Sequence, residues 1–173
     1  MAGLTLADAA VLVTGAAACV TDLRSRRIPN VLTFGASVAA VVFAAVTGGV
    51  QGAGWSLAGW AIGCAVFMPW FLLGGMGAGD VKLLAALGAW AGPSAVVWMA
   101  LYGALAGGVF AIVVSLARGY LGEMCRNLWH LLMFWRIAGI QPHPEMTLRT
   151  GRGPRLPYAF PITFGAVAVL WLK

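Results

Sequence analysis

Long apolar stretches, separated by short polar or glycine-rich segments, make up most of this chain. A membrane-spanning helix needs about 20 mostly apolar residues, and shorter helices are tolerated inside a bundle. Six stretches meet this requirement, at residues 4–21, 31–47, 55–73, 81–91, 94–117 and 156–172. The pattern therefore predicts an all-α fold, a polytopic membrane bundle of about six transmembrane helices that forms one domain over residues 1–173.

Residues 118–155, between the fifth and sixth stretches, follow a different pattern. Over residues 120–137 polar side chains recur every three to four positions among apolar ones: Glu123, Arg126, Asn127 and His130. This periodicity predicts an amphipathic helix at the cytoplasmic membrane surface, with basic side chains available to anionic lipid headgroups. Residues 141–161 are rich in Pro, Gly and Arg, which predicts an irregular loop.

The composition decides between a soluble and a membrane protein. Hydrophobic residues make up 61% of the chain and charged residues 9%, with five acids and eleven Lys or Arg. A soluble domain carries about 25% charged residues. The apolar content excludes disorder, and three separated cysteines exclude a disulfide scaffold. The chain is thus predicted to be an integral membrane protein.

The basic residues orient the six predicted spans. Ten of the eleven fall on one side of the membrane, namely Arg24, Arg26, Arg27, Lys82, Arg118, Arg126, Arg136, Arg149, Arg152 and Arg155. Only Lys173 falls on the other side. The positive-inside rule makes the first side cytoplasmic and places both termini outside.

Small residues spaced four apart recur within the predicted spans. The glycine pairs are Gly59 with Gly63, Gly88 with Gly92, and Gly103 with Gly107. Such spacing allows helix backbones to approach closely in lipid. We interpret these pairs as tight packing within one bundle rather than as a dimer face.

Two of the five acids lie at the predicted membrane boundary, where an ionisable side chain is energetically costly and indicates a functional site. Asp22 and Asp80 both fall at the predicted cytoplasmic boundary, on different spans, and Asp80 follows four glycines in six residues. Asp8 lies about 21 Å from Asp22 along a helix, so it cannot share their site. Two structural explanations remain open: Asp22 as the ion-pair partner of Arg24 or Arg26, and Asp80 as a helix N-cap.

Three motifs resemble those of the type IV prepilin peptidases, which are aspartic peptidases of the GxGD type. Residues 75–84 read Gly-Met-Gly-Ala-Gly-Asp-Val-Lys-Leu-Leu and contain the GxGD motif. Asp22 and the Ile-Pro pair at 28–29 are similar to that family's Asp-x5-Ile-Pro segment. Residues 156–161, Leu-Pro-Tyr-Ala-Phe-Pro, resemble its entry into the last span.

The resemblance implies a peptidase that removes the short basic leader of pilin-like precursors at the cytoplasmic face of the bacterial inner membrane. Carried over to this sequence, Asp22 and Asp80 are the catalytic residues. The supporting motif residues are Gly77, Gly79, Lys82, Pro29 and Pro157. The two glycines are expected to let a substrate backbone reach Asp80, and Lys82 is not expected to pair with Asp80 directly.

The cysteine pattern narrows the resemblance to one form of the family. Larger members carry paired CxxC zinc motifs associated with N-methylation, and this chain has no CxxC. It resembles the short, peptidase-only form of tight-adherence (Flp) pilus systems, so methylation is not expected. No cofactor or metal is expected either, because His130 and His143 lack ligand partners at suitable spacing.

Other functions agree less well with the sequence than the peptidase. Nucleic-acid binding is not expected, because membrane topology explains the positions of the basic residues. The alternative from another class is a small proton- or cation-coupled membrane transporter subunit that uses Asp22 and Asp80. Transporter sites lie near the bilayer midplane, however, whereas both aspartates are predicted at one interface. The sequence leaves the oligomeric state open.

Overall fold

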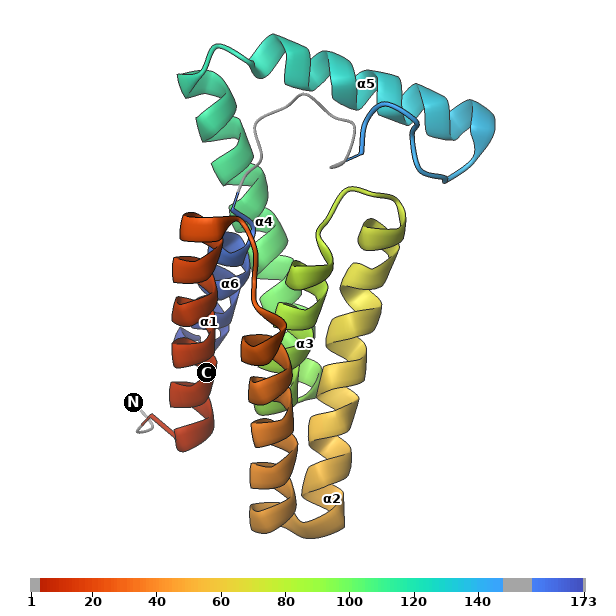
Figure 1. The fold of residues 1–173 in the computed structure, drawn as a ribbon. Helices are drawn as coiled ribbons and strands as arrows, with labels where there is room; N and C mark the ends of the chain where they lie inside the picture. The colour runs from red at the N-terminus through yellow and green to blue at the C-terminus, as the bar shows by residue number, and fades with distance from the viewer. Residues whose placement is uncertain (1–3, 148–156, 173) are drawn as a thin grey trace.

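The computed structural model describes residues 4–147 and 157–172, and these residues form six α-helices with no strand among them. The helices are α1 (Leu6–Ser25), α2 (Asn30–Leu72), α3 (Ala78–Ala91), α4 (Pro93–Ala117), α5 (Leu121–Ala138) and α6 (Ala159–Trp171). Figure 1 shows α1, α2, α3, α4 and α6 side by side along one axis, with α5 lying across one end. The predicted all-α class is confirmed.

Helix α2 contains 43 residues, about twice the length that one membrane crossing requires. Its path reverses at Gly49, whose backbone is non-helical at φ +61° and ψ −150°. Figure 1 shows the two resulting arms running side by side, and Gly52 of the second arm lies directly against the backbone of Ala44 in the first. A positive φ is readily adopted only by glycine, so this one residue makes the turn between the two predicted spans.

Helix boundaries differ from the predicted spans by a few residues. α1 begins where Thr5 and Asp8 cap each other's amides, both at 3.1 Å, and continues to Ser25 rather than ending at residue 21. α3 starts at Ala78 rather than at residue 81. α6 starts at Ala159, and residue 156, where that span was predicted to begin, lies outside the described residues.

Helix α3 is the centre of the bundle and contacts α1, α2, α4 and α6. Residues 83–87 are completely buried, as expected for a helix that is apolar on all sides. The second arm of α2 approaches it through glycine: Gly59 lies against Gly88, and Gly63 lies against Ala85. The interpretation of this glycine pair as packing within one bundle is therefore confirmed.

Helix α6 is attached to α1 by a threonine and to α4 by a glycine. The Thr163 hydroxyl donates to the carbonyl oxygen of Gly15 at 3.2 Å and accepts from the Cys19 thiol at 3.3 Å. Gly165 lies against the backbone of α4 at Met99 and Gly103. These contacts hold α6 between α1 and α4.

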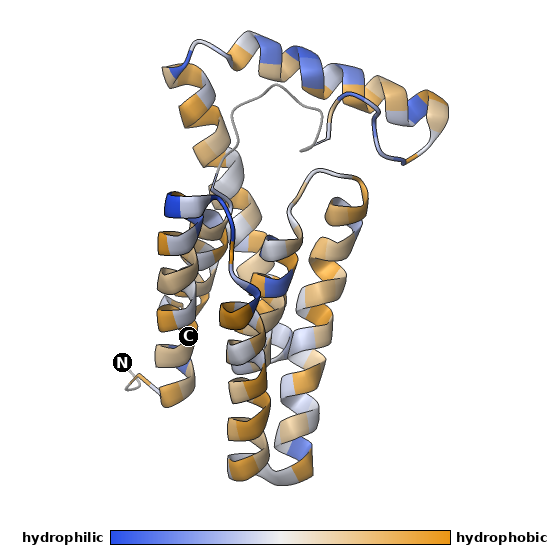
Figure 2. Ribbon diagram, in the orientation of Figure 1, coloured by the Kyte–Doolittle hydropathy of each residue, from blue (hydrophilic) through white to orange (hydrophobic). Residues whose placement is uncertain are grey.

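Helix α5 stands apart from this core. It contacts only α4 among the described helices, and none of its residues is buried. Figure 2 shows blue polar and orange apolar segments alternating along it, in agreement with the predicted amphipathic character. Two side-chain contacts fix its start: Ser115 Oγ donates to Met124 Sδ at 3.2 Å, and Asn127 Nδ2 donates to Tyr120 Oη at 3.2 Å.

Three helices among the described residues are long and apolar enough to cross a membrane: α1, α2 and α4. α6 is a shorter apolar helix. Large apolar side chains are exposed all along these helices, among them Val13, Val42, Trp55 and Leu105. Such an outer surface is stable in lipid and unfavourable in water, so the fold is that of a membrane protein.

The packing of Gly59 against Gly88 gives the first prediction. A Cβ at position 59 would overlap the Gly88 carbonyl group, whereas a Cβ at Gly54, also on α2, has nothing within 4 Å. We expect Gly59→Ala to lower the free energy of unfolding by about 1–3 kcal/mol because overpacking displaces α3. Gly54→Ala should leave it unchanged or raise it slightly.

Thermal unfolding of the purified variants in detergent measures this difference. Equal stability of the two variants would contradict the close contact between α2 and α3.

Candidate active site

The structure brings Asp22 and Asp80 to the same end of the bundle. Asp22 lies in the last turn of α1, and Asp80 lies in the first turn of α3, which contacts α1. Each residue is only 8% exposed, and Asp22 lies within electrostatic range of Asp80. Two carboxyl groups from different helices therefore share one largely buried site.

Asp80 is held by the start of its own helix. Gly77 is the N-cap residue of α3, and its N–H donates to Asp80 Oδ2 at 3.2 Å. The interpretation of Asp80 as the N-cap is thus wrong in position, because Asp80 is the third residue of the helix. A Cβ on Gly77 would lie 3.1 Å from Asp80 Oδ2, so glycine makes room for the carboxylate.

Asp22 is held by the start of another helix. The N–H of Ala159, the first residue of α6, donates to Asp22 Oδ2 at 3.3 Å. The amides at a helix N-terminus have no partner within the helix and carry partial positive charge, so they stabilise an anion. Each aspartate therefore accepts a backbone hydrogen bond from the beginning of a helix.

Tyr158 is a site residue that the sequence reasoning missed. It is the N-cap residue of α6, next to Ala159, and it lies within electrostatic range of Asp80. The Pro157 before it is the predicted supporting residue at the entry to the last helix. Pro157 is the sequence feature that could have indicated Tyr158, because proline commonly precedes or opens a helix and so marks where unpaired backbone amides lie.

Gly79 lies against the connector between α1 and α2. A Cβ at position 79 would lie 3.3 Å from the Cβ of Ile28, in the connector between α1 and α2. Glycine at this position therefore leaves room for Ile28, and its expected role in letting a substrate backbone reach Asp80 stays a prediction. The contact between Ile28 and Gly79 joins the connector to the beginning of α3. The next residue of the connector, Pro29, is the N-cap residue of α2.

Lys82 is directed toward α2 instead of toward the aspartates. Its Nζ donates to Asn30 Oδ1 at 2.9 Å and lies 5.2 Å from the centre of the Phe34 ring. Asn30 is the first residue of α2, so this contact joins the beginnings of α2 and α3. Lys82 thus contacts α2 from the helix that carries Asp80, and its supporting role stays a prediction.

The basic side chains gather at the same end of the bundle as the two aspartates. Figure 2 shows polar segments at the end of α1, at the start of α3 and along α5. The described basic residues there are Arg24, Arg26, Arg27, Lys82, Arg118, Arg126 and Arg136. Arg149, Arg152, Arg155 and Lys173, which also served to predict orientation, lie outside the described residues.

A family model for the type IV leader peptidase family matches residues 9–112, more than half of the chain. The chain belongs to the type IV leader peptidase family. The matched residues run from α1 into α4 and include both Asp22 and Asp80. No curated protein and no solved structure matches it.

The described residues of the chain include no group of three or more His, Cys, Asp or Glu placed to hold a metal ion. The groups assembled at the site are two carboxyls and two helix N-termini. Carboxyl groups act as general acids and bases when one of them is protonated and the other ionised. The arrangement therefore suits proton transfer during hydrolysis.

The proximity of Asp22 and Asp80 gives the second prediction. In a chain whose Cys19, Cys64 and Cys125 are replaced by alanine, Asp22→Cys with Asp80→Cys should be joined efficiently by a short bifunctional thiol reagent. In the matched pair, Asp8→Cys with Asp80→Cys, the two cysteines should not be joined by the reagent, because Asp8 lies about 21 Å from Asp22 along α1.

Mass spectrometry of tryptic fragments measures the bridge. Equal bridging in both pairs, or bridging in neither, would contradict the shared site.

Proposed function

We propose that this protein is a membrane aspartic endopeptidase that removes the leader peptide of pilin-like precursors at the cytoplasmic face of the bacterial inner membrane. One observation carries the proposal. In a chain of the leader peptidase family, two aspartates from different helices lie buried together, and each is hydrogen-bonded to the start of a helix.

The chemistry follows from the nearness of the two carboxyls. Hydrolysis by two carboxyl groups needs one of them ionised and the other protonated, and two negative charges in one buried site disfavour ionisation of both. The ionised carboxyl removes a proton from water as the oxygen attacks the carbonyl carbon of the leader bond. The protonated carboxyl stabilises the developing oxyanion, and a proton is delivered to the departing amine.

The proposed membrane arrangement has six crossings: α1, the two arms of α2, α3, α4 and α6. Helices α3 and α6 contain 14 and 13 residues, fewer than a lipid-facing crossing needs, but α3 is enclosed by its neighbours. The basic residues near Asp22 and Asp80 favour a cytoplasmic location for that end. α1 ends and α6 begins at that end of the bundle, so in the proposed arrangement both chain termini lie toward the outside.

The amphipathic α5 is proposed to lie on the cytoplasmic membrane surface. Its apolar side chains Leu128, Trp129 and Leu132 are exposed, and Arg126 and Arg136 supply positive charge. A helix of this kind inserts its apolar face among lipid headgroups and is attracted by anionic ones.

A transporter subunit using the same aspartates is the alternative. Ion sites of transporters lie near the bilayer midplane, where helices are broken. Here the aspartates lie at the end of α1 and the start of α3, and the break in α2 at Gly49 is separate from them. The family relationship also favours hydrolysis.

The two aspartates give the third prediction. We expect Asp22→Asn and Asp80→Asn each to reduce leader removal by at least about a thousandfold, because the pair loses its acid–base function. Asp8→Asn should leave cleavage unchanged, since Asp8 lies at the other end of α1. The size of a co-expressed pilin precursor on a gel measures cleavage.

All three variants should insert and fold, which their yield in membranes and their thermal unfolding check. Full leader removal by either Asp22→Asn or Asp80→Asn would refute the aspartic mechanism.

A further inference from the structure

The segment that follows α5 returns toward the loop between α2 and α3. Figure 1 shows residues 139–147 folding back from the far end of α5 toward that loop. Trp135 Nε1 of α5 donates to the carbonyl oxygen of Gln141 at 3.0 Å. The rings of Phe134 and His143 meet edge to face, with their centres 4.6 Å apart. These contacts fasten the returning segment to α5, and we call the two together the α5 unit.

The α5 unit ends in a compact turn. The Glu145 N–H donates to His143 Nδ1 at 3.2 Å, and the Met146 N–H donates to the His143 carbonyl oxygen at 3.4 Å. The next residue, Thr147, lies against Gly74: a Cβ at Gly74 would be 2.8 Å from Thr147 Cγ2 and 2.9 Å from Thr147 Cβ. The Thr147 side chain therefore occupies the space that a side chain at position 74 would need.

Gly74 begins the loop that leads from α2 to Asp80, which we call the α2–α3 loop. Its φ of +76° is readily adopted only by glycine, and its N–H donates to the carbonyl oxygen of Phe71 at 2.9 Å. Three residues later, the N–H of Gly77 donates to Asp80 Oδ2 at 3.2 Å. The α2–α3 loop is thus fixed to α2 at one end and to Asp80 at the other, and Thr147 contacts the end at α2.

The α5 unit touches the rest of the protein at both of its ends. Among the described helices α5 contacts only α4, and the Ser115–Met124 contact lies at its start. Thr147, at the other end of the unit, contacts the α2–α3 loop. A displacement of the α5 unit would therefore displace the loop that holds Asp80, and a misplacement of about 1 Å can slow a reaction by about a hundredfold.

We propose that Thr147 is a positioning residue, held at the end of the α5 unit so that it fixes the α2–α3 loop at Gly74 and thereby directs the Gly77 N–H at Asp80. The expected effect on cleavage rests on the proposed peptidase function, whereas the effect on the loop does not. The proposal makes α5, the helix assigned above to the membrane surface, part of the support of the active site.

Removal of the Thr147 side chain tests the proposal. Thr147→Gly should lower kcat for leader removal by about tenfold and change KM by less than about twofold, because Asp80 is misplaced while the precursor still binds. Thr147→Val keeps the Cβ and a methyl group in contact with Gly74, so it should retain the kcat of the unchanged chain.

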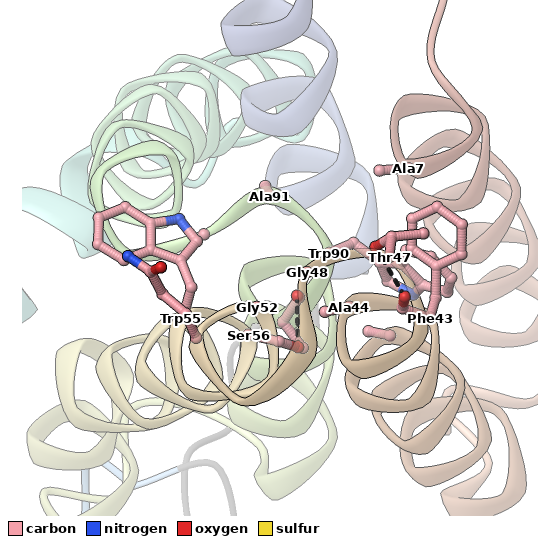
Figure 3. A pocket seen from close by; sticks show the side chains of 14 residues that line it. Ala7, Phe43, Ala44, Thr47, Gly48, Gly52, Trp55, Ser56, Trp90 and Ala91 are labelled. Carbon is pink, nitrogen blue, oxygen red and sulfur yellow. Dashed lines mark hydrogen bonds between the residues drawn. The ribbon is translucent and has the colours of Figure 1, made fainter.

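Thr47→Gly is the matched control. Thr47 lies next to the turn of α2, at the opposite end of the bundle from α5, and Figure 3 shows it beside a cavity of about 550 Å³. Glycine disfavours a helix, so Thr47→Gly should lower Tm slightly and leave kcat and KM unchanged. Equal losses of kcat in Thr47→Gly and Thr147→Gly would show general destabilisation and overturn the proposal.

Release of the returning segment from α5 should have a weaker effect of the same kind. Trp135→Phe removes the donor to Gln141, and we expect it to lower kcat by about threefold without changing KM. Trp98→Phe, at an exposed tryptophan of α4, should leave kcat unchanged. Equal kcat values in the two variants would contradict a role for the α5 unit.

Alkylation of a single cysteine reports on the α2–α3 loop without any substrate. In a chain whose three natural cysteines are replaced by alanine, Met76→Cys places one thiol in this loop. Met76 is half-buried, so release of the loop should expose the thiol. We expect Thr147→Gly to raise the rate of alkylation by a water-soluble maleimide at least about threefold, and Thr147→Val to leave it unchanged.

An unchanged alkylation rate in Thr147→Gly, or an unchanged kcat in the same variant, would overturn the proposal. Failure of the peptidase proposal would look different. The unchanged chain would then not cleave a pilin precursor, while the alkylation rates of the Thr147 variants would still differ.

Discussion

A carboxylate removed from water needs hydrogen-bond donors to replace its hydration, and the site depends on how this protein supplies them. The helix starts at Gly77 and Ala159 each direct one backbone N–H at an aspartate oxygen. Hydrogen bonds to charged groups contribute about 1.5–3 kcal/mol each. Because the donors are backbone groups at helix ends, the positions of α3 and α6 determine where the buried carboxylates of Asp80 and Asp22 are stabilised.

Those helix positions follow from packing that only small residues permit. α3 is enclosed because Gly59 and Gly63 let the second arm of α2 approach its backbone. Its start is fixed by Gly79 against Ile28 and by Lys82 with Asn30. α6 is fixed by Thr163 against Gly15 of the helix that carries Asp22. The glycines thus serve mainly to bring the helices of the site together.

The apolar spans and their orientation could be predicted from the sequence. Hydropathy indicates which segments contact lipid, and the basic residues indicate which helix ends lie at the same end of the bundle. Asp22 and Asp80 could be placed together on that basis. The donor to Asp22 could not, since Pro157 marks the start of a helix but not which carboxylate the N–H of Ala159 would bind. The contact of Gly79 with Ile28 could not be predicted either, because the two residues are distant in sequence. The turn at Gly49 lies among several glycines, and the sequence does not distinguish which of them reverses the chain.

The central claim is that Asp22 and Asp80 act on the leader bond as one unit. A double-mutant cycle of single-turnover cleavage rates tests it most directly, using Asp22→Asn, Asp80→Asn and the two changes combined. Residues that act as a unit are strongly non-additive, so the account predicts that the double variant is no slower than either single variant. A double variant whose loss in rate equals the product of the two single losses would contradict it.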